Sequence, residues 1–422
     1  MINNTTRREL WLLLTLAGIQ FTHILDFMIM MPLGPQFTQL FGINEAEFGL
    51  LVSAYTLAAG ASGLVASAYI DRFGRKRLLL VMYTLFALAT LACGLAPTYA
   101  SLMAARIAAG IFGGVLSAMS QTIVGDVIPF ERRGRAMGIV MTSFSVASVV
   151  GVPAGLFMAA HLSWHAPFFA IAALSMVFAV FAAITLPPLR GHLKGSHSSS
   201  AWQRISSVMS DANHLKAFGF SALMMLAAFP VVPYIAIQMQ FGVGLRSDQL
   251  PYIYLCGGLA SIFTARLFGQ LTDRWGKVQS YRLIALLLIP CLFALTLLPL
   301  GTPLWLALLA STLLMICGSG RMIPAMAIVT SAANPALRGT FMSLNSAVQS
   351  AAMGAGAFVG GSLISRDATG QLQNFWQAAL FGSVASLLGV WLAGRLDLHF
   401  STVSAPLTPP ERAPAPVQAL DP

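Results

Sequence analysis

Long apolar runs separated by short polar breaks dominate the hydrophobic pattern of this 422-residue chain. A helix that crosses a bilayer core of about 30 Å needs roughly 20 predominantly apolar residues, and twelve stretches are long enough. Several breaks between them are so short that the flanking helices must form hairpins. The predicted spans are 10–31, 48–70, 78–96, 99–125, 136–159, 166–187, 216–238, 248–271, 281–299, 303–330, 340–364 and 375–396. The pattern therefore predicts an all-α membrane protein with twelve transmembrane helices.

Composition excludes several other classes of protein. Hydrophobic residues make up 57% of the chain and charged residues only 9%, whereas soluble domains carry about 25% charged residues. A soluble enzyme, a disordered chain and a nucleic-acid-binding domain are therefore excluded. The four cysteines lie inside apolar stretches and form no CxxC pair, so we expect no metal site, cofactor or disulfide. No Walker loop is present, so ATP does not drive the protein directly.

The placement of the basic residues predicts the orientation in the membrane. The net charge is +10, and 19 of the 24 Lys and Arg residues fall in alternate loops or termini on one side. Only Arg246 and Arg366 fall on the other side, and Arg106, Arg266 and Arg321 lie within spans. Because cytoplasmic loops are enriched in Lys and Arg, both termini are expected in the cytoplasm. The basic excess then contacts anionic lipid headgroups rather than nucleic acid.

The chain reads as two similar halves. Asp273 follows Asp71 by 202 positions, and Gly276 follows Gly74 by the same interval. Such parallel repeats are typical of transporters. The predicted organisation is an N-terminal six-helix bundle (1–187), a cytoplasmic linker (188–215) that includes a short helix around 202–209, a C-terminal six-helix bundle (216–397), and a disordered Pro-rich cytoplasmic tail (398–422).

Several motifs resemble those of the major facilitator superfamily, over about 390 residues. They are Asp71-Arg72-x-Gly74-Arg75-Lys76 and its second copy Asp273-Arg274-x-Gly276-Lys277, Arg106-x-x-x-Gly110, Asp126-x-x-Pro129-x-x-Arg132-Arg133-Gly134, and Gly151-Val152-Pro153-Ala154-Gly155. The last of these is similar to the antiporter motif of the twelve-span drug:proton branch. The chain departs from the family at Ser67, where Gly is usual, and at His165, where Arg is usual. The resemblance implies two pseudo-symmetric six-helix bundles in a bacterial inner membrane.

Three polar residues share one predicted depth in the first half. At 1.5 Å per residue, Asp26 lies about 9 Å, Arg106 about 12 Å and His23 about 13 Å below the outer surface. Ionised groups at such depth are costly and usually functional. We interpret Asp26 as a protonatable carboxylate in a central cavity. A proton and the Arg106 guanidinium then compete for this carboxylate. The alternative is a permanent ion pair that only locks two helices together. Arg106 could instead contact an anionic substrate, and His23 is either a proton relay or a polar cavity residue.

Arg266 and Arg321 lie closer to the cytoplasmic ends of their spans, and we expect both to snorkel to the interface. In the loop motifs, the resemblance implies that Asp71 meets the start of span 11 near Arg338 when the cytoplasmic side closes. By the repeat, Asp273 would meet the start of span 5 near Arg133. The gating residues are then Asp71, Arg72, Gly74, Arg75, Asp273, Arg274, Gly276, Arg133 and Arg338. The alternative is that these loops only fix the orientation of the protein in the membrane through their positive charge. This explains the basic residues of the set but not the aspartates.

Small residues four positions apart predict close helix packing at Gly151 and Gly155, around Pro153, and at Gly356 and Gly360. The C-terminal half lacks Asp, Glu and Lys at mid-depth. Its polar cavity candidates are Tyr234, Gln238, Asn345 and Gln349, with apolar walls around them. This lining suits neutral or amphipathic organic molecules.

The sequence thus predicts a secondary transporter, not an enzyme, that works as a monomer. The expected activity is export of small amphipathic organic compounds, including drugs, in exchange for protons by alternating access. One alternative is a proton-coupled sugar or metabolite transporter, importing or exporting. Another is a membrane sensor that transports nothing, although two gating-loop copies argue against it.

Overall fold

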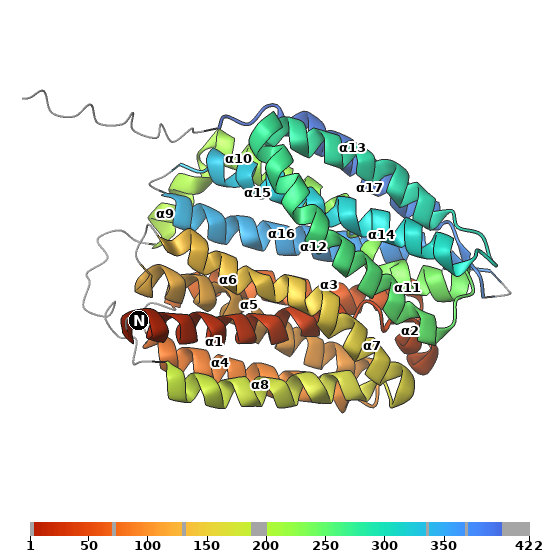
Figure 1. Cartoon of the computed structure of the whole chain (residues 1–422), viewed down its shortest axis with the longest axis horizontal. Helices are drawn as coiled ribbons and strands as arrows, with labels where there is room; N and C mark the ends of the chain where they lie inside the picture. Colours follow the sequence, from red (N-terminus) through yellow and green to blue (C-terminus); the bar gives the residue numbers. More distant parts are fainter. Residues whose placement is uncertain are drawn as a thin grey trace, which may run out of the picture.

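The computed structural model describes residues 4–69, 73–128, 132–186, 201–334, 337–367 and 370–398. Nearly all of them are helical, and the helices run side by side along the long axis of the molecule (Figure 1). Helices up to α8 form one half of the bundle in Figure 1, and those from α9 onward form the other. This is the helical membrane fold predicted from the hydrophobic pattern.

The first half holds α1 (Asn4–Ile29), α2 (Gly34–Phe41), α3 (Glu45–Tyr69), α4 (Arg75–Gly94), α5 (Tyr99–Val127), α6 (Arg133–Val146), the π-helix η3 (Ala147–Gly151), α7 (Val152–His161) and α8 (His165–Thr185). The second half holds α9 (Ala201–Met209), α10 (Ala212–Leu226), η5 (Val232–Tyr234), α11 (Ile235–Ile237), η6 (Gln238–Gly242), η7 (Ser247–Gln249), α12 (Leu250–Trp275), α13 (Lys277–Thr296), α14 (Leu304–Gly320), α15 (Met322–Ala332), α16 (Arg338–Leu363), the strands β1 (Ser365–Arg366) and β2 (Leu372–Gln373), and α17 (Phe375–Ala393).

Ten of the helical segments in the described part of the chain are long and apolar enough to cross a membrane. Two predicted spans fall outside this set. The seventh contains only the 15 residues of α10 before the chain turns around Phe229 and Pro230. The eleventh, α16, has 26 residues but is rich in Gly and Ser. The structure is therefore consistent with twelve spans, one of them interrupted and one less apolar than the ten.

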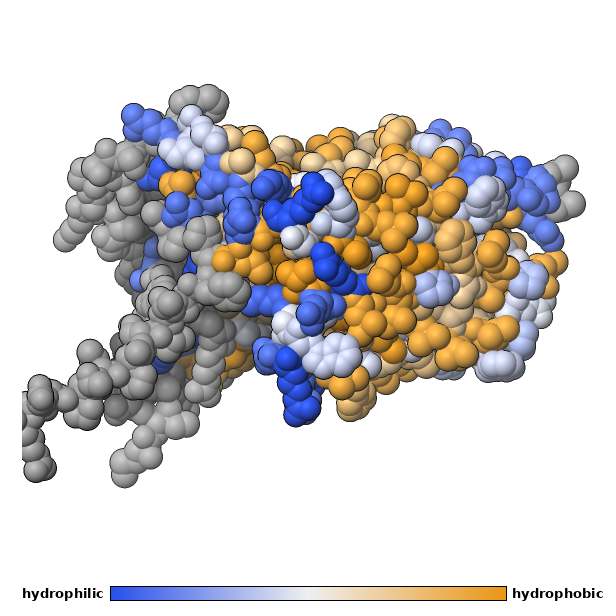
Figure 2. Space-filling model, turned by 90° about the horizontal axis from the view of Figure 1, so that it is seen from above, coloured by the Kyte–Doolittle hydropathy of each residue, from blue (hydrophilic) through white to orange (hydrophobic). Residues whose placement is uncertain are grey.

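The surface carries a broad apolar zone. Figure 2 shows hydrophobic residues over much of the visible face, with hydrophilic residues gathered toward the two ends and a smaller hydrophilic group within the zone. Large side chains such as Phe263, Ile184, Val177 and Trp305 are more than half exposed. Exposure of this extent would be unfavourable in water and suits hydrocarbon as the solvent.

The two ends of the bundle differ. We call the end where α1 begins and α17 ends the termini face, and the opposite end, which carries α2 and the β1–β2 hairpin, the distal face (Figure 1). At the termini face, Asn213 at the start of α10 bonds the backbone of Asp397. The chain therefore enters and leaves at one end, as an even number of spans requires.

Local sequence explains several helix ends. Thr98 and Ser101 form a reciprocal capping box that starts α5, and Asp211 caps α10. Gly276 separates α12 from α13 with φ of 86°, a conformation that side chains with a Cβ rarely adopt. Gly74, its counterpart in the first motif copy, has φ of −63°, so only the second copy requires glycine for its backbone.

Some expectations fall outside the described residues. These are Asp71 and Arg72, the side chain of Arg133, residues 188–200 of the predicted linker, and the predicted tail apart from Leu398. Within the predicted linker, the short helix is present as α9, which packs on α10 and α16.

Candidate functional site

A buried ion pair joins α1 to α5. Nη1 of Arg106 donates to Oδ2 of Asp26 at 2.8 Å and also to its backbone carbonyl at 3.3 Å. Both side chains are fully buried. The structure thus brings together two residues that the depth estimate placed at one level; their roles in transport stay predictions.

The Asp26–Arg106 pair leaves some of its hydrogen-bond donors and acceptors without partners among the described residues. Among the described residues, Oδ1 of Asp26 and the Nε and Nη2 atoms of Arg106 have no hydrogen-bond partner. The guanidinium also lies 4.2 Å from the centre of the Tyr55 ring, a cation–π arrangement. A bidentate Arg–carboxylate pair would use both oxygens. This one leaves a carboxylate oxygen and two donors available for a proton, water or substrate.

His23 and Tyr55 complete this polar cluster. His23 lies one helical turn before Asp26, and its ring centre is 6.2 Å from that of Tyr55. Both ring nitrogens of His23 and the Tyr55 hydroxyl lack protein partners in the described part of the chain. A Cβ at Gly113 of α5 would lie only 2.5 Å from the His23 ring and 2.9 Å from the Tyr55 hydroxyl. Glycine at 113 therefore lets both groups approach α5.

A cavity of about 500 Å³ lies between the two halves. Its lining extends from His23 along α3, α5 and α16 to Arg204 and Gly339 near the termini face. The stretch of α16 from Gly339 to Ser350 that lines it is about 16 Å long. Of the three predicted coupling residues, only His23 lines this cavity. The expectation that Asp26 and Arg106 face it directly is wrong for this state, because they lie fully buried beyond His23.

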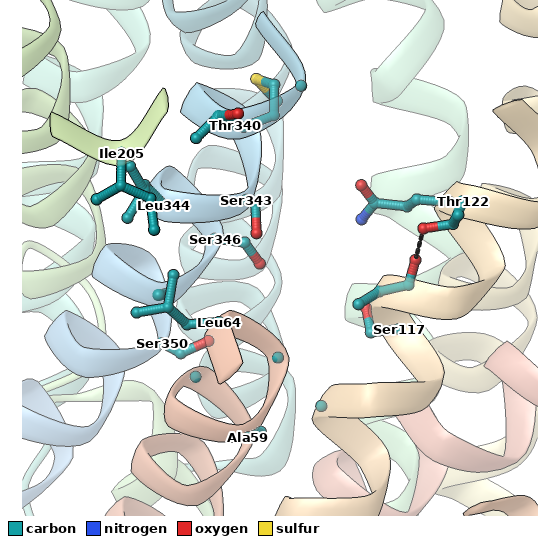
Figure 3. A pocket seen from close by; sticks show the side chains of 18 of the residues that line it. Ala59, Leu64, Ser117, Thr122, Ile205, Thr340, Ser343, Leu344, Ser346 and Ser350 are labelled. Atoms are coloured by element: carbon teal, nitrogen blue, oxygen red, sulfur yellow. Dashed lines mark hydrogen bonds between the residues drawn. The ribbon is translucent and has the colours of Figure 1, made fainter. Parts of the chain in front are cut away.

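Hydroxyl groups are frequent in the lining. Figure 3 shows Ser343 and Ser346 of α16 facing Ser117 and Thr122 of α5 across the cavity. Thr122 donates back to the carbonyl of Ala118 at 2.9 Å. Ile205, Leu344 and Leu64 add apolar contacts at one side (Figure 3). The walls are therefore more polar than the apolar lining expected from sequence.

The four polar candidates of the C-terminal half do not line this cavity. The hydroxyl of Tyr234 donates to the carbonyl of Ala357 at 2.5 Å, and the Gln238 amide donates to Leu298 at 3.4 Å. Asn345 is buried and Gln349 half-buried, and neither is among the lining residues. Their assignment to a substrate site stays a prediction.

The antiporter-like motif packs beside the ion pair. Pro153 follows the π-helix η3, and the glycines on either side of it face α1. A Cβ at Gly151 would lie 2.8 Å from Leu25, and one at Gly155 2.5 Å from Ile29. Because these two α1 residues flank Asp26 in sequence, the motif sets how closely this part of α1 approaches α7.

The second half repeats this packing. Gly360 of α16 lies so close to the backbone of Pro230 that a Cβ would overlap its carbonyl. A Cβ at Gly356 would lie 3.0 Å from Phe229. Span 11 therefore packs on span 7 as span 5 packs on span 1, which agrees with the predicted repeat.

Contacts between the halves close the distal face. Nε of Arg366 on β1 donates to Oε1 of Glu45 on α3 at 2.5 Å, although 321 positions separate them. Deeper in the bundle, Ser53 donates to the carbonyl of Gly354 at 2.6 Å. We call these four residues the distal gate. Farther around the interface, α12 packs on η3 and α7. Together these contacts hold the halves together at the end opposite the cavity mouth.

The predicted gating residues at the termini face are arranged differently. Arg75 is buried and pairs with Asp126 of α5 at 2.9 Å, within the first half. Asp273 and Arg274 are exposed, and no ion pair to Asp273 occurs in the described part of the chain. Arg338 at the start of α16 is also exposed.

One expectation about the isolated arginines is wrong. Arg266 is exposed on α12, as snorkelling requires, but Arg321 is only 2% exposed. With its side chain buried, Arg321 does not extend to the interface in this structure. No sequence signal distinguished the two residues.

The fold and the site define a polytopic membrane protein with a polar cavity between two helical halves. The family description "Major Facilitator Superfamily" matches residues 16–357. The chain therefore belongs to the major facilitator superfamily, whose members are membrane transporters rather than enzymes.

Relatives and solved structures agree with this assignment. The uncharacterized MFS-type transporter YceJ of Bacillus subtilis (strain 168) is 25% identical over 340 residues, 80% of this chain and 84% of that protein. Multidrug resistance protein 2 of the same organism is 24% identical over 277 residues, 62% of this chain and 67% of that protein. A bacterial homologue of the human lysosomal transporter Spinster, inward-facing and unoccupied, superimposes with a TM-score of 0.71 at 15% identity, covering 92% of this chain and 98% of that one. A D-xylose–proton symporter gives a TM-score of 0.73 at 16% identity, covering 90% and 96%. At these identities the two structures support the fold alone.

Proposed function

We propose that the protein is a secondary active transporter that exports small amphipathic organic compounds in exchange for protons. The observation that carries the proposal is the buried Asp26–Arg106 pair, placed next to a cavity residue and left with unused hydrogen-bonding atoms. A pair that served only to hold two helices together would be most stable if every donor and acceptor of the two groups were hydrogen-bonded. This one retains the capacity to exchange partners.

In the proposed coupling step, proton binding and the Asp26–Arg106 pair compete. A proton enters through the cavity, is passed on by His23, and binds Oδ1 of Asp26. Neutral Asp26 attracts Arg106 less strongly, so the guanidinium is freed for other partners and α1 is released from α5. Substrate bound near Arg106 favours loss of the proton from Asp26. Protonation and substrate occupancy therefore exclude each other, which produces exchange rather than co-transport.

Alternating access needs two states, and the present arrangement fits one of them. The distal gate is closed while the cavity reaches the termini face. With the termini in the cytoplasm of a bacterial cell, as the basic loops predict, this is the inward-facing state. The opposite state requires the distal gate to separate and the loop aspartates to meet the starts of α6 and α16.

The cavity supports a second candidate function. Its serine and threonine hydroxyls suit a substrate with many hydroxyl groups, such as a sugar or another polar metabolite. A neighbour of similar fold is described as a D-xylose–proton symporter, whereas one relative is described as a multidrug resistance protein. The leucine and isoleucine side of the cavity favours the amphipathic class.

Proteoliposomes with an imposed pH gradient test both functions and the sensor alternative. The purified protein is reconstituted, and a panel of amphipathic amines, aromatic acids and sugars is added one at a time. Counterflow of protons and compound supports exchange. Parallel flow of protons and a sugar supports the second function, and binding without flux of either supports a sensor.

A further inference from the structure

Arg321 is a buried cation in the second half of the protein. It lies at the junction of α14 and α15, eleven residues before the end of that span at Ala332, or about 16 Å along the helix. This is near the middle of a hydrocarbon layer of about 30 Å. Pro324, one turn later, has no N–H to continue the helical hydrogen bonds, which accounts for the irregular turn at Arg321.

Among the residues that the structure describes, the Arg321 guanidinium has no counter-charge. In the described part of the chain, its Nε and Nη1 atoms have no hydrogen-bond partner, and no carboxylate pairs with it. The titratable side chains that interact with it electrostatically are the Tyr281 hydroxyl and the Cys317 thiol. The Tyr281 hydroxyl also lacks a partner within those residues. The sequence contains no Asp or Glu between Asp273 and Asp367, so no span from α13 to α16 can supply one.

The two halves differ at this point. Arg106 is neutralised by Asp26 from the same half, whereas no described residue neutralises Arg321. Arginine stays protonated in proteins, and an unpaired buried charge costs several kcal/mol. A cation kept at this cost inside a transporter points to an anion from outside the chain.

We propose that Arg321 binds the anionic group of the transported compound, a carboxylate or sulfonate, with the Tyr281 hydroxyl as a second donor. The inference rests on the proposed transport function and narrows its substrate class to amphipathic organic anions. The planar guanidinium offers two parallel N–H donors to such a group. The rest of the compound would contact the apolar side chains of α12–α15.

The first test needs no ligand. Replacing an unpaired buried cation with an apolar side chain of similar length removes a desolvation cost without breaking a bond. Arg321→Met should therefore raise the thermal unfolding temperature of the purified protein in detergent. Arg266→Met, which removes an exposed arginine from the same half, should change it little. A clear fall for Arg321→Met would mean that the guanidinium is structurally paired, and would overturn the proposal.

The second test uses matched probes. Naphthalene carboxylate and naphthalene sulfonate should stabilise the wild-type protein against thermal unfolding more than the neutral naphthalene carboxamide does. In Arg321→Met the affinity for both anions should fall about tenfold or more, the effect of losing one charge-assisted hydrogen bond, while the carboxamide is unaffected. Arg321→Lys should retain part of the preference, and Arg266→Met all of it.

Two results would overturn the proposal. One is the absence of stabilisation of the wild-type protein by either aromatic anion. The other is equal stabilisation by sodium chloride or sulfate at the same concentration, which would assign the site to an inorganic anion. Neither test uses a proton gradient, so proton exchange and anion recognition can fail independently.

Discussion

Oδ2 of Asp26 lies 2.8 Å from Nη1 of Arg106, and neither side chain is accessible to solvent. The pair joins α1 to α5 beside the floor of a cavity, and Oδ1 of the carboxylate is unused by the described part of the chain. An ion pair in this position contributes to stability only while both partners are present. This dependence allows the structural and functional roles of the pair to be separated.

The first prediction concerns stability. Arg106→Met leaves the Asp26 carboxylate buried without a cation, and should destabilise the fold by about 3–5 kcal/mol. Asp26→Asn combined with Arg106→Met removes both charges and should recover much of this loss. Thermal unfolding of the two single variants and the double variant gives the interaction energy. Additive effects would mean that the two charges do not stabilise each other.

The second prediction concerns the distal gate. Glu45→Gln weakens the bond to Arg366, so the distal face should open more often. A cysteine introduced at Ser53, in a background without native cysteines, should then react faster with a membrane-impermeant maleimide added from the distal side. Asp248→Asn is the control, because its pair with Arg246 is exposed and such pairs contribute little. An unchanged labelling rate in Glu45→Gln would show that this pair does not close the face.

The third prediction concerns helix packing. At Gly360 an added methyl group would overlap the Pro230 carbonyl, which is backbone, whereas at Gly155 it would meet the flexible end of Ile29. Gly360→Ala should therefore lower the unfolding temperature more than Gly155→Ala. Gly138→Ala, where no atom lies within 4 Å of the new carbon, should be neutral or slightly stabilising. Equal losses at Gly360 and Gly138 would contradict the packing argument.

The fourth prediction concerns the loop aspartates. Asp273 has no ion-pair partner among the described residues in this state, and is proposed to gain one near Arg133 when the termini face closes. Asp273→Asn and Asp71→Ala should thus lower the turnover rate of transport while leaving substrate affinity nearly unchanged. Rates of counterflow and equilibrium binding measured on one preparation separate the two quantities. A change in affinity alone would contradict a gating role.

The sequence predicted the helical membrane fold and the common level of Asp26 and Arg106, because both depend on quantities that add up along the chain. An apolar run of fixed length defines a membrane span, and the rise per residue then places Asp26 and Arg106 at one level. The spacing of Gly356 and Gly360 likewise predicted a close helix contact, although not its partner at Pro230.

The sequence could not predict features that depend on helix rotation or on contacts between the halves. Spans that are apolar on all sides have no stripe that shows which side faces lipid, so the serines of the cavity were missed and Tyr234 was placed there instead. Glu45 and Arg366 lie in segments 321 positions apart, and no local rule joins them. Arg321 was misplaced for the same reason, because its burial depends on neighbouring helices.

The central claim is that Asp26 carries the transported proton, and Asp26→Asn tests it most directly. The variant is reconstituted beside the wild-type protein at equal density, and proton release is followed with a trapped pH dye after compound is added across an imposed gradient. We predict that Asp26→Asn retains compound binding but releases no protons, while the wild-type protein releases them. Proton release by Asp26→Asn at the wild-type rate would contradict the account.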